Sequence, residues 1–317
     1  MKKVVVFAYS NVGVRCLKVL LAAQKQSGFE ISLIVTHHDN PWEKIWFDSV
    51  AEVARDYQIP AVFPEQAELA EIEKQLDTIQ PDFIFAFYYR YMLPTSLLEK
   101  ARQGAYNMHG SLLPKFRGRA PTNWAVLKGA TETGATLHEM VAKPDAGAII
   151  AQTAVPILPD DTGEDAFNKM CVAAEQTLWQ ALPAVIAGNA PRLPNDLANG
   201  SYFGGRKPED GRIDWEQPAQ EIYNLIRAVA PPYPGAFFDV TTNGKSERFM
   251  IARARYRDEA QFQTDTLTTL LGKKPDLGVH VIGQQFFGVT ADGVIHIHEL
   301  RHNGQPVSTE QYFNLIA

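Results

Sequence analysis

The first ninety residues alternate short apolar runs with amphipathic stretches, and this alternation constrains the fold more than any other feature. Apolar runs of strand length occur at residues 4–8, 31–35 and 83–87. Apolar residues at helical spacing occur at 13–24, 46–57 and 68–78. Strands that alternate with helices are typical of βαβ units in a sheet that is covered on both faces. The sequence therefore predicts an α/β fold, with a Rossmann-like, mostly parallel sheet and helices on both faces.

The pattern continues to about residue 188 and then changes. A short helix is expected near 94–100, strands at 105–109, 136–141 and 148–155, and a long helix at 164–188. Residues 110–123 are crowded with Gly, Pro and Arg and predict a structured loop rather than an element. Residues 189–207 hold several Pro, Asn and Gly residues and predict a linker. We therefore expect a first domain over residues 1–200 and a second over 201–317.

The second domain should contain a helix and several short strands. The helix is predicted at residues 219–229, and the strands at 237–241, 246–255, 279–282 and 294–300. Short strands at this spacing are typical of a small C-terminal β-barrel of the OB-like kind.

Charge and cysteine content exclude several classes of protein. The net charge is −6, so no overall basic field exists to attract a nucleic acid. Cys16 and Cys171 lack metal or redox spacing and are expected to be buried thiols in a reducing compartment. No uncharged apolar stretch reaches ~18 residues, so the chain is expected to be soluble and cytoplasmic with no membrane span. His296 and His298 share one strand face without a third ligand, so no metal site is expected.

Asn107 and His109 are the first residues that suggest chemistry. They lie two apart on a predicted strand, so their side chains project about 7 Å apart on one face, at the edge where open α/β sheets bind ligands. Asp145 follows in a tight loop and could raise the pKa of His109. An amide donor and an imidazole that moves protons are the groups acyl transfer needs. Taken alone, Asp145 is also typical of a turn beside proline, and Asn107 of a structural hydrogen bond.

The run NMHGSLLPKFRGRAPTNW at residues 107–124 resembles the signature of the folate-dependent formyltransferases, and KPDAGAI at 143–149 resembles the loop of their third catalytic residue. THHDNPWEK, FAFYYRYML and AVAPPYPGAF extend the similarity along most of the chain. The resemblance implies a catalytic, formyl-folate-binding first domain and formyl transfer from 10-formyltetrahydrofolate to a primary amine without a metal. It implies Asn107, His109 and Asp145 as the catalytic residues. It also implies folate contacts, mainly through backbone, at Tyr91, Met92, Leu93, Val141, Ala142, Lys143, Pro144 and Asp145, with Arg119 near the cofactor.

The acceptor is expected to be a nucleotide-linked amino sugar. The segments resemble those of family members that formylate UDP-4-amino-4-deoxy-L-arabinose in the lipid A modification that gives polymyxin resistance. A stand-alone enzyme, without the decarboxylase domain that is fused to those members, is expected. Methionyl-tRNA formyltransferase is the alternative, but its basic insertion after the second strand corresponds to a short, non-basic stretch at residues 38–52. Deformylation, in which water replaces the amine, stays open, as does the oligomeric state. A nicotinamide oxidoreductase is disfavoured because the first turn has a single glycine, Gly13.

Other residues carry narrower expectations. Arg206 or Arg227 is hypothesised to help neutralise the diphosphate of the nucleotide. Ser111 lies in no GxSxG elbow and is expected to bond its own loop. His138 is expected to be a satisfied core histidine. His37 and His38 are expected to be an exposed loop pair, and the alternative is that they line the cleft on the folate side.

Overall fold

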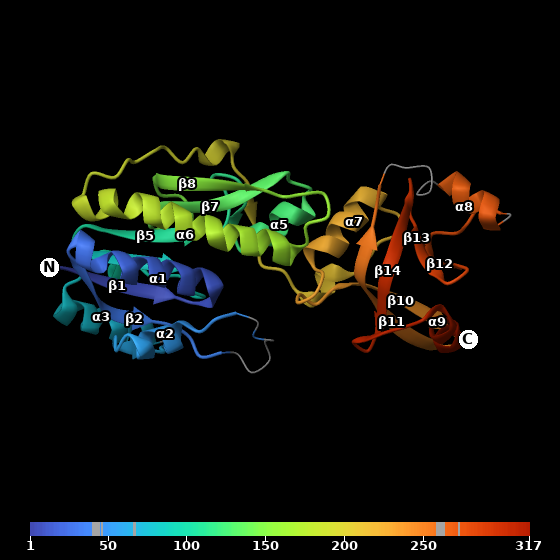
Figure 1. Cartoon of the computed structure of the whole chain (residues 1–317), viewed down its shortest axis with the longest axis horizontal. Helices are drawn as coiled ribbons and strands as arrows, with labels where there is room; N and C mark the ends of the chain where they lie inside the picture. The colour runs from blue at the N-terminus through green and yellow to red at the C-terminus, as the bar shows by residue number, and fades with distance from the viewer. Residues whose placement is uncertain (40–44, 46, 66–67, 258–263, 272) are drawn as a thin grey trace. The chain divides into compact units, whose positions relative to one another are not determined.

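The computed structural model describes residues 1–317 except 40–44, 46, 66–67, 258–263 and 272 (Figure 1). The chain divides into two compact units. The first consists of Met1–Thr122, Glu132–Pro156 and Phe167–Gly204, and the second of Asn123–Thr131, Ile157–Ala166 and Gly205–Ala317. The second unit thus takes two short segments from the first 200 residues, which the sequence-based division after residue 200 did not include.

A seven-stranded sheet forms the first unit, in the order β3-β2-β1-β4-β5-β7-β8. The five parallel strands are β1 (Lys2–Ala8), β2 (Phe29–Val35), β3 (Ala61–Val62), β4 (Phe83–Phe87) and β5 (Gly104–His109). Two antiparallel strands, β7 (Glu132–Glu139) and β8 (Ile149–Pro156), complete one edge. The predicted Rossmann-like, mostly parallel sheet is confirmed, and the two-residue β3 is an addition to the prediction.

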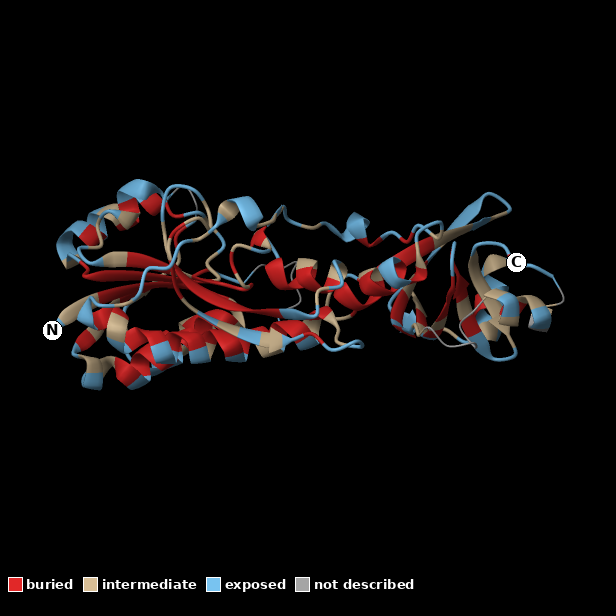
Figure 2. Ribbon diagram, turned by 90° about the horizontal axis from the view of Figure 1, so that it is seen from above, coloured by how far each residue is buried: buried red, intermediate tan, exposed pale blue. Residues whose placement is uncertain are grey.

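The central strands are apolar on both faces because both faces are covered. Val4 and Val6 of β1 belong to one apolar layer, whereas Val5 and Phe7 belong to the other. Helices α1 (Ser10–Ser27), α2 (Val50–Asp56) and α6 (Gly163–Ala187) contribute to the first layer. The second layer includes residues of α3 (Leu69–Ile79) and α4 (Thr95–Leu98). Figure 2 shows the resulting band of buried strand residues.

Two expected irregular segments are more structured than predicted. The loop at 110–123 contains β6 (Arg117–Gly118) and the start of α5 (Pro121–Leu127), where Pro121 takes the first helical position that its fixed φ suits. The expected linker at 189–207 contains a 3₁₀ turn at Leu197–Asn199 and β9 (Tyr202–Phe203), which pairs with β6. The sequence signal failed here because two-residue strands have no detectable period and form only through their partners.

The second unit contains an antiparallel sheet in the order β10-β11-β14-β13-β12, with β15 (Gln305–Pro306) beside β14. Its strands are β10 (Ala236–Thr242), β11 (Lys245–Arg255), β12 (Gly278–Ile282), β13 (Gln285–Val289) and β14 (Val294–His302). Its helices are α7 (Ala219–Ala228), α8 (Thr264–Leu271) and α9 (Thr309–Ile316), with a 3₁₀ turn at Pro208–Gly211. Within the described ranges no pairing joins β10 to β12, so the expected barrel is an open half-barrel.

Both cysteines are buried free thiols, as expected. Burial raises the pKa of Cys171 to about 12, so the thiol is uncharged at neutral pH. In the part of the chain that the structure describes, no helix is both long and apolar enough to cross a membrane.

Leu17 on α1 tests the first apolar layer. Its side chain is fully buried, so we expect Leu17→Ala to lower the free energy of unfolding by about 2–5 kcal/mol through lost burial and a residual cavity. Lys18→Ala, on the exposed side of the same helix, is the matched control and should change it by less than about 0.5 kcal/mol. Urea denaturation curves measure both, and equal midpoints for the two variants would contradict the packing described.

Candidate active site

Asn107 is held by a buried histidine on the neighbouring strand. The antiparallel register of β5 and β7 places Asn107 opposite His138, and Asn107 Nδ2 lies 3.0 Å from His138 Nε2. His138 Nδ1 lies 2.8 Å from the carbonyl oxygen of Glu139, which only accepts, so Nδ1 carries the proton. Burial, helped by the nearby His109, lowers the pKa of His138 to about 4. The neutral Nε2 therefore accepts a hydrogen bond from Asn107 and fixes the amide with its nitrogen toward β7.

His109 ends β5 and contacts Asp145. His109 Nε2 donates to the carbonyl oxygen of Phe116 at 2.9 Å, so the other ring nitrogen, Nδ1, faces the carboxylate. The distance from Nδ1 to Asp145 Oδ1 is 3.5 Å, and the same oxygen lies 3.7 Å from His138 Nε2. The His109 side chain is 6% exposed and that of Asp145 13%. The amide, the imidazole and the carboxylate predicted from the sequence are thus brought together, and His138 lies next to both Asn107 and Asp145.

The backbone around Asp145 is held from two sides. Asp145 has a φ of 49°, a left-handed conformation that aspartate tolerates better than most residues. Its Oδ2 accepts from the backbone N–H of Gly118 at 2.9 Å. Asn195 Nδ2 donates to the carbonyl oxygens of Asp145 and Gly147 at 3.0 and 3.1 Å. These bonds give the carboxylate a fixed direction toward the two histidines.

Gly118 is required where it donates to Asp145. Its φ is 97°, and a Cβ at this position would collide with the carbonyl oxygen of Phe203 on the paired strand β9. The sequence predicted only a loop at Gly118 and gave no sign of this role, because the pairing of β6 with β9 joins residues 85 positions apart.

Ser111 and Thr136 hold the loop that follows His109. Ser111 is fully buried and donates to the carbonyl oxygen of Lys115 at 2.7 Å. Thr136 Oγ1 donates to the carbonyl oxygen of Ser111 at 2.6 Å and accepts from the N–H of Leu113 at 3.1 Å. The expected loop role of Ser111 is confirmed.

The expected folate contacts lie on two segments. Tyr91, Met92 and Leu93 follow β4, the strand beside β5; Met92 is exposed and Leu93 is buried in the second apolar layer. Tyr91 donates from its hydroxyl to Glu65 Oε2 at 3.1 Å.

The second segment follows β7 and leads to Asp145. Val141, Ala142 and Lys143 are exposed and Pro144 is half-buried. Arg119 donates its backbone N–H to Phe203 at 3.0 Å, and its side chain is exposed.

The expectation of an exposed histidine pair is wrong for His37. His37 is 7% exposed, its Nε2 accepts from the N–H of Arg90 at 3.0 Å, and its ring stacks on Tyr89 with centroids 4.1 Å apart. Burial, followed by the charge of Arg90, lowers its pKa to about 4. His38 is exposed and stacks on Phe63 at 4.5 Å. Both histidines line a cavity of about 130 Å³ next to the carboxyl ends of β1 and β2.

The hypothesis that Arg227 neutralises a diphosphate is wrong. Its guanidinium is buried and donates to Asn224 Oδ1 at 3.0 Å and to the carbonyl oxygens of Asp161 and Val126 at 3.0 and 3.3 Å. Arg206 donates to the carbonyl oxygen of Asp210 at 3.0 Å and lies over the ring of Trp124. Among the described residues, no cluster of three His, Cys, Asp or Glu side chains is arranged to hold a metal ion.

Comparison with protein families defines the class of protein to which this site belongs. The profile described as "Formyl transferase" matches residues 2–182, and "Formyl transferase, C-terminal domain" matches residues 206–316. Together they cover most of the chain, so the protein belongs to the formyl transferase family of enzymes.

Solved structures share the fold. The chain is 18% identical to an N-formyltransferase from Helicobacter canadensis solved with folinic acid and dTDP-3-aminofucose, with a TM-score of 0.68 over 94% of this chain and 99% of that one. It is 20% identical to WlaRD, a sugar 3N-formyltransferase solved with dTDP and 5-N-formyl-THF, with a TM-score of 0.66 over 94% and 97%. The chain is 17% identical to HypX from Aquifex aeolicus, with a TM-score of 0.61 over 99% of this chain and 47% of that one.

The buried histidines predict a pH dependence of stability. Folded His138 and His37 have pKa values of about 4, below the ~6.5 of an unfolded histidine, so the unfolded chain binds more protons between these values. The free energy of unfolding should therefore fall as pH drops from about 6.5 to about 4. We expect ¹⁵N NMR to show His138 as the neutral Nδ1–H tautomer at pH 6, assigned by loss of its signal in His138→Gln. A His138 signal that titrates between pH 7 and 5.5 would contradict this assignment.

Proposed function

We propose that this protein transfers the formyl group of 10-formyltetrahydrofolate to the primary amine of a nucleotide-linked amino sugar. The observation that carries the proposal is the convergence of Asn107, His109 and Asp145 at the end of β5. The family supplies the reaction class. The ligands in the Helicobacter enzyme and in WlaRD, a folate with a dTDP sugar or with dTDP, support the choice of donor and acceptor.

The three side chains supply what the reaction requires. A bond forms between the amine nitrogen and the formyl carbon, and the bond from that carbon to the folate nitrogen breaks. The amine loses one proton and the leaving nitrogen gains one. Asn107 has one amide hydrogen on His138, which leaves its second hydrogen to stabilise the oxyanion. His109 and Asp145, which face each other through Nδ1 and Oδ1, carry the proton between the two nitrogens.

The folate would be held in the first unit, which we propose as the catalytic domain. Backbone groups of Tyr91, Met92 and Leu93 and of residues 141–145 are the proposed contacts, with Arg119 beside them. The exposure of Met92, of residues 141–143 and of Arg119 is compatible with that role.

The acceptor that we propose is UDP-4-amino-4-deoxy-L-arabinose. The similarity of the segments at residues 36–44, 85–93 and 228–237 to the enzymes of lipid A modification supports this sugar. The net charge of −6 and the non-basic stretch at 38–52 disfavour a tRNA acceptor.

The substrate is tested by incubating the protein with 10-formyltetrahydrofolate and a panel of acceptors. The panel holds UDP-4-amino-4-deoxy-L-arabinose, dTDP-3-amino and dTDP-4-amino sugars and methionyl-tRNA, and mass spectrometry detects a mass gain of one formyl group. We expect the UDP sugar to give the highest kcat/KM. Turnover of a dTDP sugar alone would correct the nucleotide, formylation of methionyl-tRNA alone would overturn the acceptor class, and release of formate without an acceptor would indicate deformylation.

The catalytic roles are tested by His109→Gln and Asp145→Asn. Each variant keeps side-chain volume but removes a group positioned for proton transfer, so kcat should fall by about 10²–10⁴-fold while the circular dichroism spectrum is retained. His280→Gln and Asp265→Asn make the same chemical changes in the second unit and should leave kcat unchanged. Near-normal turnover in either active-site variant would refute the roles assigned to His109 and Asp145.

A further inference from the structure

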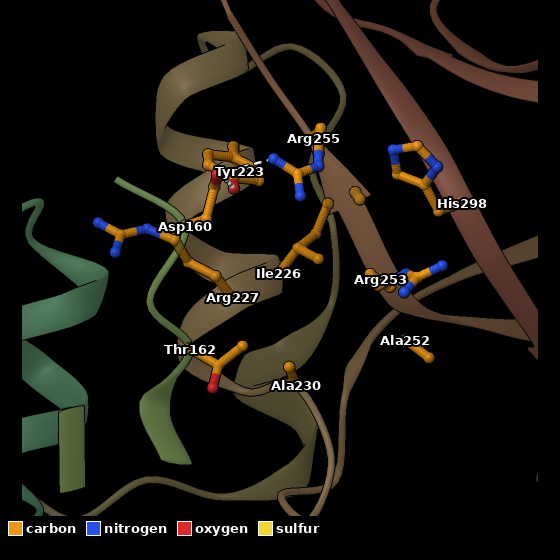
Figure 3. A pocket seen from close by; sticks show the side chains of 11 residues that line it. Asp160, Thr162, Tyr223, Ile226, Arg227, Ala230, Ala252, Arg253, Arg255 and His298 are labelled. Carbon is orange, nitrogen blue, oxygen red and sulfur yellow. Dashed lines mark hydrogen bonds and ion pairs between the residues drawn. The ribbon is translucent and has the colours of Figure 1, made fainter. Parts of the chain in front are cut away.

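The second unit contains a cavity that the proposed reaction does not use. Its volume is about 280 Å³, and its walls come from α7, β11, β14 and the segment at residues 160–162 (Figure 3). Small-molecule pockets range from about 300 to 1,000 Å³, so this cavity suits a small molecule or one group of a larger one. None of its lining residues belongs to the set at the end of β5.

Arginine side chains dominate the charge of the cavity. Arg227, Arg253 and Arg255 line it, whereas Asp160 is the one carboxylate among its lining residues. The guanidinium of Arg227 is already occupied by bonds to Asn224, Asp161 and Val126, and Figure 3 shows it turned away from Arg253 and Arg255. The net charge that faces the cavity therefore depends on which ion pairs Arg253, Arg255 and Asp160 form.

Asp160 is shared by several donors. It accepts from Arg255 Nη1 at 2.8 Å and from the Tyr223 hydroxyl at 2.6 Å, and it also pairs with Arg257. The bond from Arg257, together with those from Tyr223 and Arg255, holds the pKa of the Asp160 carboxyl below its ordinary value. One carboxylate thus orients two guanidinium groups, and a surplus of positive charge is left.

Among the residues that the structure describes, none is an acidic partner of Arg253. It lies two residues before Arg255 on β11 and is exposed. The register of β11 and β14 puts Glu299 opposite it, but Glu299 Oε1 is bound by Arg301 through Nε at 2.7 Å and Nη2 at 2.6 Å. Within the described part of the chain, the Arg253 guanidinium forms no ion pair or side-chain hydrogen bond. Its five donors are available to a ligand.

The pKa of His298 is affected by the positive charges of these arginines. His298 lines the cavity from β14 and packs against His296, with ring centroids 4.3 Å apart and ring planes tilted by 39°. Burial, the neighbouring His296 and the charges of Arg253 and Arg255 all lower the pKa of His298. An anion in the cavity would relieve the repulsion among these cationic groups and use the free donors of Arg253 and Arg255.

We propose that this cavity binds the phosphate group of a small phosphorylated molecule, through the free guanidinium of Arg253 and the remaining donors of Arg255. Planar guanidinium groups match the oxygens of a phosphate in pairs, and the two that line this cavity from β11 suit a mono- or diphosphate. The apolar walls from Ile226, Ala252 and Ala254 exclude some water and strengthen such bonds. The concave shape and the small volume favour a small molecule over a nucleic acid. The inference is independent of the proposed formyl transfer.

Isothermal titration of the full chain tests the proposal. The probes are orthophosphate, diphosphate and UDP, each titrated without folate or acceptor, so that binding is read apart from catalysis. Wild-type protein should bind diphosphate, and Arg253→Gln should weaken the affinity by about tenfold or more. Lys245→Gln removes the same charge from the other end of β11 and should leave the affinity unchanged. Thermal melting checks that both variants are folded.

A second measurement uses the wild-type protein alone. The ¹⁵Nε resonances of Arg253 and Arg255 should shift on addition of diphosphate, whereas those of Arg212 and Arg248, which pair with Asp239, should not. No binding at 10 mM diphosphate, equal weakening in Arg253→Gln and Lys245→Gln, or shifts spread over all exposed arginines would overturn the proposal. Tighter binding of a single-stranded RNA oligonucleotide, lost in Arg253→Gln, would replace the small molecule with a nucleic acid.

Discussion

The pairing of β5 with β7 is the constraint on which the site depends. It sets Asn107 opposite a buried, neutral histidine and directs the amide of Asn107, while His109 ends the same strand. Without this register the two side chains of β5 would still share one face, but the amide would have no fixed orientation. His138 is thus a positioning residue: it is satisfied, as a core histidine should be, and its partner is the residue that we propose as oxyanion donor.

The loop that carries Asp145 is the second part of the arrangement. A left-handed aspartate is costly, and it persists here because Gly118 and Asn195 bind it through its side chain and its backbone. Gly118 can donate only because β6 pairs with β9 and no Cβ intervenes. The carboxylate therefore has its direction before any substrate binds, which is what pre-organised electrostatic catalysis requires.

Helices and strands with strong hydrophobic periodicity could be predicted from the sequence. Short strands that form only by pairing with segments far away in the chain could not. The apolar runs of β1, β2 and β4 were clear because buried parallel strands are continuously hydrophobic. The short strands β3, β6 and β9 have two residues each, so no period exists to detect. Helix α9 is short, and its sequence signal is the capping box that Ser308 and Gln311 form at its start.

The same division holds for the site. Asn107, His109 and Asp145 were predictable from strand spacing and family resemblance, and they do converge. The contacts of His138, Gly118 and Asn195 could not be predicted, because they depend on strand register and on segments far apart in the sequence. The burial of His37 was missed because its partners, Tyr89 and the backbone of Arg90, come from a loop after another strand.

We propose that His109 and Asp145, whose Nδ1 and Oδ1 atoms face each other at 3.5 Å, act as one proton-carrying unit. A double-mutant cycle on kcat with His109→Gln, Asp145→Asn and the double variant measures their coupling. If the two residues act as one unit, the kcat of the double variant should be about equal to that of the slower single variant. If the fold-losses in kcat of the two single variants multiply in the double variant, the residues act independently and the proposed unit is contradicted.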